Sequence, residues 1–165
     1  MSNWAEDLLR RHRNAGIILD TNMLLLYFVG LLDPRIIPTF KRTDNFAIED
    51  FYTLQAILTL IPRVVTTPNI LTEVSNLLGQ LPNYQKVPCF DLLAAGIELL
   101  DEQYLESKPI AAMGEFRRFG ITDAGLMTLA KAHLIVTIDF PLSNYLSSAG
   151  IDVLNFNNIR MLNWQ

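Results

Sequence analysis

Three things are scarce in this sequence: cysteine, charge and long apolar runs. The single cysteine, Cys89, allows no disulfide within the chain, which excludes a disulfide-stapled scaffold and fits a reducing compartment. The longest apolar run, Met23–Leu32, is roughly half as long as a membrane-spanning helix. The N-terminal stretch is polar and charged, without the apolar core of a secretory signal. We therefore expect a cytoplasmic protein that does not contact membranes.

The charge balance also limits the function classes. Only 18% of the 165 residues are charged, and the formal net charge is −4. This balance argues against binding nucleic acid by bulk positive charge, but it leaves open an enzyme with an acidic centre. Half of the residues are apolar, which predicts a folded chain with a core of its own. No repeat or linker divides the sequence, so we expect a single domain over residues 1–165.

The order of apolar runs and helix signals predicts an α/β fold. Continuous apolar segments, typical of buried parallel strands, occupy residues 16–20, 63–66, 133–138 and 151–154. Helical patterns occupy residues 4–14, 21–29, 47–61, 69–78, 89–105, 123–132 and 141–148, with a short helix near 111–119. This alternation predicts a three-layer α/β/α sandwich around a mostly parallel sheet of about four or five strands.

Helix boundaries follow from glycine, proline and capping residues. Gly30 is expected to end the helix that begins at Thr21. Thr67, followed by Pro68, is a strong start signal, and Thr122 is expected to cap the helix that follows it. Residues 79–88 contain one glycine and two prolines and are expected to form a loop.

Four acidic residues stand close to junctions between a strand or turn and a helix: Asp20, Glu73, Asp123 and Asp139. Each has a plain structural explanation. Asp20 and Asp139 are suited to helix caps or turns, Asp123 to the positive end of a helix, and Glu73 to a solvated helix face. Glu73, however, is the only charged residue between Val64 and Gly79. The order and context of the set carry more information than any one member.

Together, the four acids predict a divalent metal centre. In an open α/β sheet such junctions gather along one edge, where carboxylates repel one another unless a cation joins them. Carboxylates are preferred ligands of Mg²⁺ and Mn²⁺, and such ions assist phosphodiester hydrolysis. Thr21, Asn22 and Thr137 are suited to support this centre through hydrogen bonds, although such residues more often form turns and caps. No histidine-rich or cysteine-rich zinc pattern competes.

Basic residues near the acids are sparse. Arg117 and Arg118 precede Asp123 by a few residues and are the best candidates for contacts with substrate phosphates. A solvated surface pair is the alternative interpretation.

The four segments resemble those of the PIN-domain family of metal-dependent nucleases. The matching features, in order, are Asp20-Thr21-Asn22 after a strand, Glu73 in the helix after the second strand, Asp123 followed by Ala124 at a helix start, and Thr137-Ile138-Asp139 closing a strand. The resemblance spans residues 16–140. It implies a parallel sheet of order 3-2-1-4-5, Mg²⁺ or Mn²⁺ as cofactor, and endoribonuclease cleavage of single-stranded or structured RNA.

The chain also departs from the compact toxins of that family. It carries an additional N-terminal helix and longer segments at residues 31–60 and 79–120. These departures leave open whether it is a VapC-like toxin with an antitoxin. Core extension, substrate choice and binding of another protein are all compatible with the added segments, as is a homodimer.

Two other functions remain as alternatives. A non-catalytic binding module of the same fold, for nucleic acid or protein, would not need the acids that this chain keeps. A phosphatase of the haloacid-dehalogenase type would need a second aspartate where Asn22 stands. The expected activity is therefore metal-dependent ribonuclease activity, with the four acids as catalytic and metal-binding residues.

Overall fold

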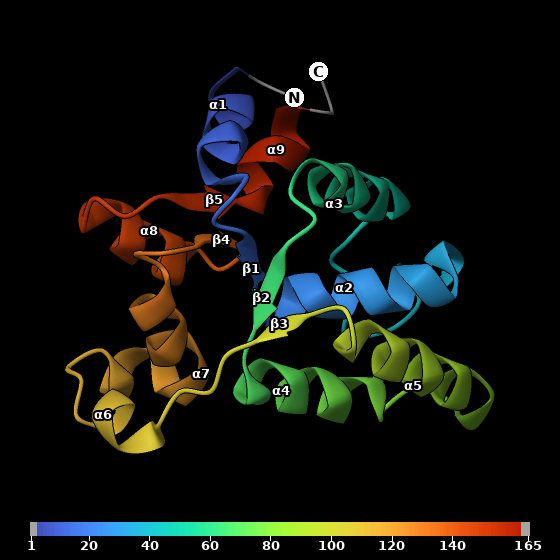
Figure 1. Ribbon diagram of the computed structural model, residues 1–165. Coiled ribbons are helices and arrows are strands. Elements are labelled where there is room, and N and C mark those ends of the chain that lie inside the picture. Colours follow the sequence, from blue (N-terminus) through green and yellow to red (C-terminus); the bar gives the residue numbers. More distant parts are fainter. Residues whose placement is uncertain (1–2, 163–165) are drawn as a thin grey trace.

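A computed structural model describes residues 3–162, which form one parallel sheet between two layers of helices (Figure 1). The strands are β1 (Ile17–Leu19), β2 (Val64–Thr66), β3 (Asp101–Glu102), β4 (Leu134–Thr137) and β5 (Val153–Asn155). Their order is β3-β2-β1-β4-β5, and every pair is parallel. The predicted three-layer α/β/α class is confirmed, and the strand order is the one that the resemblance implies.

The helices are α1 (Asn3–His12), α2 (Thr21–Leu32), α3 (Ile48–Leu60), α4 (Pro68–Leu78), α5 (Asn83–Ile97), α6 (Ser107–Ala111), α7 (Phe116–Leu129), α8 (Phe140–Ser148) and α9 (Phe156–Leu162), with a 3₁₀ turn η1 (Pro34–Ile36). Helices α2 to α5 lie on one side of the sheet and α6 to α8 on the other (Figure 1). Within residues 3–162, no helix is long and apolar enough to cross a membrane.

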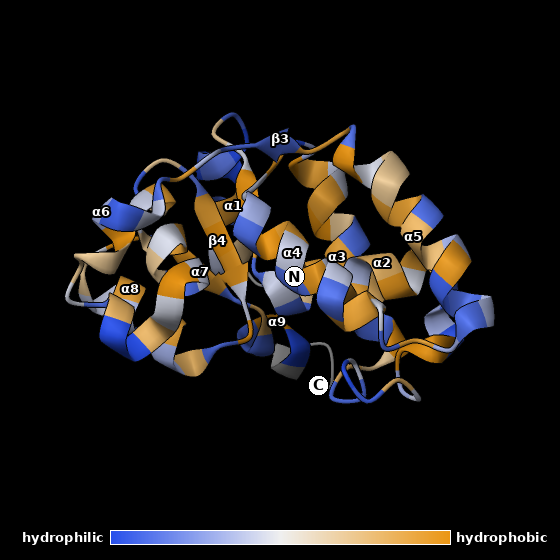
Figure 2. Ribbon diagram, turned by 90° about the horizontal axis from the view of Figure 1, so that it is seen from below, coloured by the Kyte–Doolittle hydropathy of each residue, from blue (hydrophilic) through white to orange (hydrophobic). Residues whose placement is uncertain are grey.

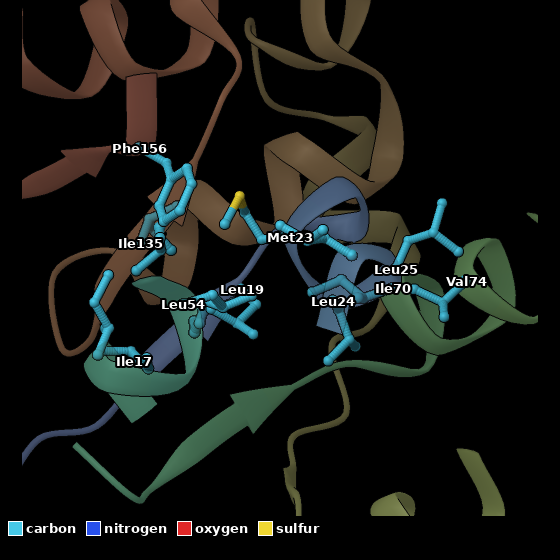
Figure 3. Packing of buried hydrophobic residues seen from close by; sticks show 14 of the residues in the cluster. Ile17, Leu19, Met23, Leu24, Leu25, Leu54, Ile70, Val74, Ile135 and Phe156 are labelled. Atoms are coloured by element: carbon cyan, nitrogen blue, oxygen red, sulfur yellow. The ribbon is translucent and has the colours of Figure 1, made fainter. Parts of the chain in front are cut away.

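The central strands are buried because helices cover both of their faces. All residues of β1 and β4 are buried, and α2 buries most of its length beneath α4 and α5. Figure 3 shows Leu25 of α2 close to Ile70 and Val74 of α4. Such strands read as continuous apolar runs, which is why the sequence predicted them well. Figure 2 shows the contrast between the apolar β4 and the hydrophilic β3 at the sheet edge.

The prediction that Gly30 ends a helix is wrong. Helix α2 continues through Gly30 to Leu32. A Cβ atom at Gly30 would lie 2.2 Å from a ring carbon of Phe51 in α3, so the glycine permits close helix packing rather than a helix end.

The predicted loop at residues 79–88 is also wrong, because α5 begins at Asn83 and contains Pro88. Proline removes the hydrogen bond to the carbonyl four residues earlier, which here belongs to Tyr84. The helix nevertheless continues through Pro88 to Ile97.

Helix α5 ends at Ile97, whereas the sequence predicted a helix to residue 105. The short strand β3 follows and pairs with β2 through Val65–Asp101 and Thr66–Glu102. Strand β5 lies slightly later than expected, because Gly150 adopts a φ of 71° and residue 151 still bonds back to Leu146. The predicted C-terminal cap is helix α9, and residues 163–165 lie outside the described part of the chain.

Helix α7 bends at Gly120, whose φ of 76° and ψ of −176° are not helical. The helical turn before the bend covers only the end of the predicted short helix near 111–119, because residues 112–115 form turns, and the turns after the bend carry Asp123. Thr122 does not cap this helix, contrary to the prediction. Its hydroxyl instead donates to a carboxylate on α4.

Candidate functional site

The predicted acids come from elements that meet at the carboxyl ends of the central strands. Asp20 directly follows β1 and Asp139 lies two residues after β4, which is the neighbour of β1 in the sheet. Glu73 lies in the second turn of α4, the helix that follows β2. Asp123 lies just after the bend in α7. This edge is where open α/β sheets place their ligands.

Asp20 is buried, with an exposed fraction of 4%, and its carboxylate is held on both oxygens. The backbone N–H of Met23 donates to Oδ1 at 2.8 Å, which caps α2, and the hydroxyl of Thr137 donates to Oδ2. The residue therefore fulfils the capping role that its sequence context suggested, and also binds β1 to β4 through a side chain.

Burial raises the pKa of Asp20 to about 6. Hydrogen bonds from Thr137, from Met23 and from the backbone of Ile138 counter this increase, because they favour the ionised carboxylate. The negative charge of Asp139 adds a smaller increase.

Thr137 joins two of the acidic residues. Its hydroxyl donates to Asp20 and accepts the backbone N–H of Asp139 at 2.9 Å. Oδ1 of Asp139 in turn accepts the N–H of Leu142 at 2.7 Å and caps α8. Thr137 is fully buried and donates its only hydroxyl proton to Asp20. Its role is thus to position Asp20 and the turn at Asp139.

Glu73 is held by two threonine hydroxyls. Thr21 donates to Oε2 and Thr122 donates to Oε1, each at 2.6 Å. Thr21 follows Asp20 in the chain and Thr122 precedes Asp123. Glu73 therefore links the start of α2 to the bend of α7, and brings the two aspartate-containing segments to the same place.

Asp123 differs from the other three acids because its carboxylate has no hydrogen-bond or ion-pair partner among residues 3–162. Its pKa is raised to about 7, first by burial and then by the negative charges of Asp20, Asp139 and Glu73. The carboxylates of Asp20, Glu73 and Asp139 thus all lie close enough to Asp123 to act on its charge.

No basic side chain of the described residues neutralises this group. The ion pairs found there use other acids, namely Asp33, Asp50, Asp101 and Asp152. Equally, no three acidic, histidine or cysteine side chains within residues 3–162 lie around a common point as a closed metal cage would require. What the edge presents is an uncompensated acidic group rather than a preformed cage.

The remaining predicted site residues are more peripheral. Asn22 is exposed in the first turn of α2. Arg117 and Arg118 are exposed in the part of α7 before the bend, and Arg118 lies over the ring of Phe119 at 4.8 Å. Neither arginine forms an ion pair with the four acids in the described structure.

Thr122 is a residue of this candidate site that the sequence did not predict, because it was interpreted only as a helix cap. A signal was present in the sequence. Asp20-Thr21 and Thr122-Asp123 are both aspartate–threonine pairs, and each threonine donates to Glu73.

Comparisons of this chain with protein-family models, with curated proteins and with solved structures give no match. The functional argument therefore depends on the geometry of the acidic group and on the resemblance carried by its four segments.

Proposed function

We propose that this protein is a metal-dependent endoribonuclease that uses Mg²⁺ or Mn²⁺ at the acidic edge of its sheet. The observation that carries the proposal is that the charges of Asp20, Glu73 and Asp139 all act on the carboxylate of Asp123, while no basic side chain of the described residues forms an ion pair with any of the four. Holding such a group together lowers stability, and a bound cation would reverse that effect. The order 3-2-1-4-5 and the ordered motifs from Asp20 to Asp139 support the same function.

The donor set fits a hard divalent ion. Mg²⁺ commonly keeps several waters and uses only one or two protein carboxylates, so a closed cage is not required. Asp123, whose carboxylate has no partner in the described structure, and Asp139, whose Oδ2 has none, would hold the ion. Asp20 and Glu73 would complete the charge around it. A bound ion would lower the pKa of a water molecule and stabilise the leaving oxygen of a phosphodiester.

The protein's own contribution is to hold these groups in place. Thr137 fixes the carboxylate of Asp20, and Thr21 and Thr122 fix that of Glu73. Side chains locked in this way lose little freedom when a substrate phosphate arrives. RNA is the proposed substrate because of the family resemblance. Binding of an antitoxin or another protein is also proposed from that resemblance alone.

The test is cleavage of a labelled RNA by purified protein with Mn²⁺, with Mg²⁺ and with a chelator. Asp20→Asn and Asp123→Asn are compared with Asp91→Asn, a matched change at an exposed residue of α5. Changing outer partners of metal ligands typically costs about 10- to 100-fold in activity, so both site variants should lose at least that much.

The control variant Asp91→Asn should cleave like the unmodified protein. Equal cleavage by all variants, or cleavage that persists in chelator, would overturn the proposal. All variants must melt cooperatively near the parent temperature, so that lost activity is not lost folding.

A non-catalytic binding module is the second candidate, and one observation favours it. Asp20 and Asp139 both serve as helix caps, and no three acids surround a common point in residues 3–162. A protein that binds no Mn²⁺ in titration calorimetry but still binds RNA would support this candidate over the nuclease.

A further inference from the structure

An exposed aromatic residue directly follows one of the four acids in the chain, and the acidic group does not explain its role. Phe140 directly follows Asp139, and 53% of its surface is exposed. Exposed apolar residues are common in proteins, so exposure alone decides nothing. The position is the informative point, because Phe140 begins α8 next to one of the acids. Ile121 is likewise an exposed apolar residue close to an acid in the chain, because it is 36% exposed and precedes Asp123 by two residues.

The backbone beneath Phe140 is firmly held. Oδ1 of Asp139 accepts the N–H of Leu142 at 2.7 Å, and the carbonyl of Asp139 accepts the N–H of Ser143 at 3.0 Å. The amide of Asn157 in α9 donates to the carbonyl of Ile138 at 2.9 Å, and Pro141 fixes the first turn. A flat apolar side chain on such a rigid base is suited to receive another flat group.

The charge balance shows why a nucleic-acid site here would need such a group. The chain has 13 lysines and arginines against 17 acidic residues, and no basic side chain of the described part pairs with the four acids. Bulk positive charge can therefore supply little of the affinity. Stacking of a base on an aromatic ring contributes about 1–3 kcal/mol per base and does not depend on positive charge.

We infer that Phe140 is a substrate-positioning residue that stacks on the nucleobase beside the phosphate bound at the acidic edge. This inference rests on the proposed function and adds a residue that selects an unstacked base over a paired one. Asp139 would then help to hold the ion that binds the phosphate, and Phe140 would stack on the adjacent base.

The test is the affinity of the full chain for a fluorescein-labelled single-stranded RNA of about 12 nucleotides, a length within the usual site sizes of single-strand binders. Binding is measured by anisotropy with Ca²⁺, for Phe140→Ala, Phe140→Trp and the unmodified protein. Tyr84→Ala on α5, also an exposed aromatic, is the matched control. A second strand with abasic central positions reports whether a base is needed.

Phe140→Ala should weaken binding to the intact strand by about 5- to 150-fold. It should have much less effect on the abasic strand, Phe140→Trp should retain binding, and Tyr84→Ala should change nothing. In cleavage assays the loss should lie mainly in KM. Equal weakening with both strands would mean a structural role and would overturn the inference.

The inference and the proposed function fail differently. RNA cleavage by the unmodified protein with unchanged binding by Phe140→Ala would overturn only the stacking role. Base-dependent loss of binding in Phe140→Ala without any metal-dependent cleavage would retain the stacking role and reject the nuclease. Absence of any RNA binding by the unmodified protein would reject the stacking role outright.

Discussion

The junction between β1 and α2 and the bend in α7 both contribute an aspartate to the same edge of the sheet, but they hold it differently. Asp20 is buried, caps a helix and receives the hydroxyl of Thr137. Asp123 is partly buried and receives no hydrogen bond from residues 3–162. Both have a raised pKa, but the charges of three other acids raise that of Asp123, whereas only the charge of Asp139 raises that of Asp20.

The carboxylate of Asp20 makes hydrogen bonds that stabilise the fold, whereas the charge of Asp123 is repelled by its neighbours and destabilises the fold. Removing a partner of Asp20 should weaken the protein, whereas removing the charge of Asp123 should strengthen it in the absence of metal. Residues that lower stability in this way are expected at functional sites. The comparison therefore predicts effects of opposite sign at the two places.

The largest effect is expected from Thr137→Val. The change leaves a buried carboxylate oxygen of Asp20 and the N–H of Asp139 without their partners. Hydrogen bonds to charged groups are worth about 1.5–3 kcal/mol, so the free energy of unfolding should fall by about 2–4 kcal/mol. Urea unfolding measures this loss. Thr59→Val, at an exposed threonine of α3, should change stability by less than about 0.5 kcal/mol.

Divalent metal should stabilise the protein through the acids. At a concentration of about 100 times its Kd, a ligand adds about 2.7 kcal/mol, or a rise in Tm of about 5–10 °C for a chain of this size. The measurement is a thermal melt with Mn²⁺ or Mg²⁺ against a chelator. Asp123→Asn should remove most of the shift and Asp91→Asn none of it. An equal shift in Asp123→Asn would mean that the ion binds elsewhere.

The pH dependence should distinguish Asp123 without metal. Its folded-state pKa is raised from 3.8 to about 7, so the stability linked to its proton is present near pH 4 and is lost as pH rises through about 7. One pKa unit corresponds to about 1.4 kcal/mol, and partial exposure reduces the effect. Asp123→Asn should be about 1–2 kcal/mol more stable than the parent at pH 8, and this advantage should vanish toward pH 4.

The smallest effect on stability is expected from Thr122→Val, because Glu73 is exposed. The loss should stay below about 1 kcal/mol, since water can replace the lost hydroxyl. Mn²⁺ affinity should nevertheless fall by about 10-fold, because the carboxylate loses one of its two anchors. Thr122→Ser should restore both values. A Thr122→Val protein with unchanged Mn²⁺ affinity would remove Glu73 from the metal-binding group.

The contrast between central and edge elements also explains how far the sequence could predict the fold. Strands β1, β2 and β4 are continuous apolar runs because both of their faces are covered, and all three were predicted. Strand β3 consists of Asp101 and Glu102 at the sheet edge. Charged residues suit an exposed edge but give no strand pattern, and only pairing with β2 makes this segment a strand.

Glycine and proline, which commonly end helices, led to wrong helix boundaries at two places. Gly30 serves the contact with Phe51, and Pro88 sits within α5. The site shows the same limit. The acids were found from their strand-helix junctions, but the hydroxyl contacts of Thr122 and Thr137 join elements far apart in the sequence. Short-range patterns do not contain such contacts.

The most direct test of the central claim is paramagnetic broadening by Mn²⁺ in the NMR spectrum of the labelled protein. If the four acids form one cation-binding group, substoichiometric Mn²⁺ should first broaden the amide signals around Asp20, Glu73, Asp123 and Asp139. Signals of Tyr84 and Asp91 on α5 should stay sharp, and Asp123→Asn should lose the selective broadening. Broadening that is weak and even across the chain, or centred away from these four residues, would contradict the account.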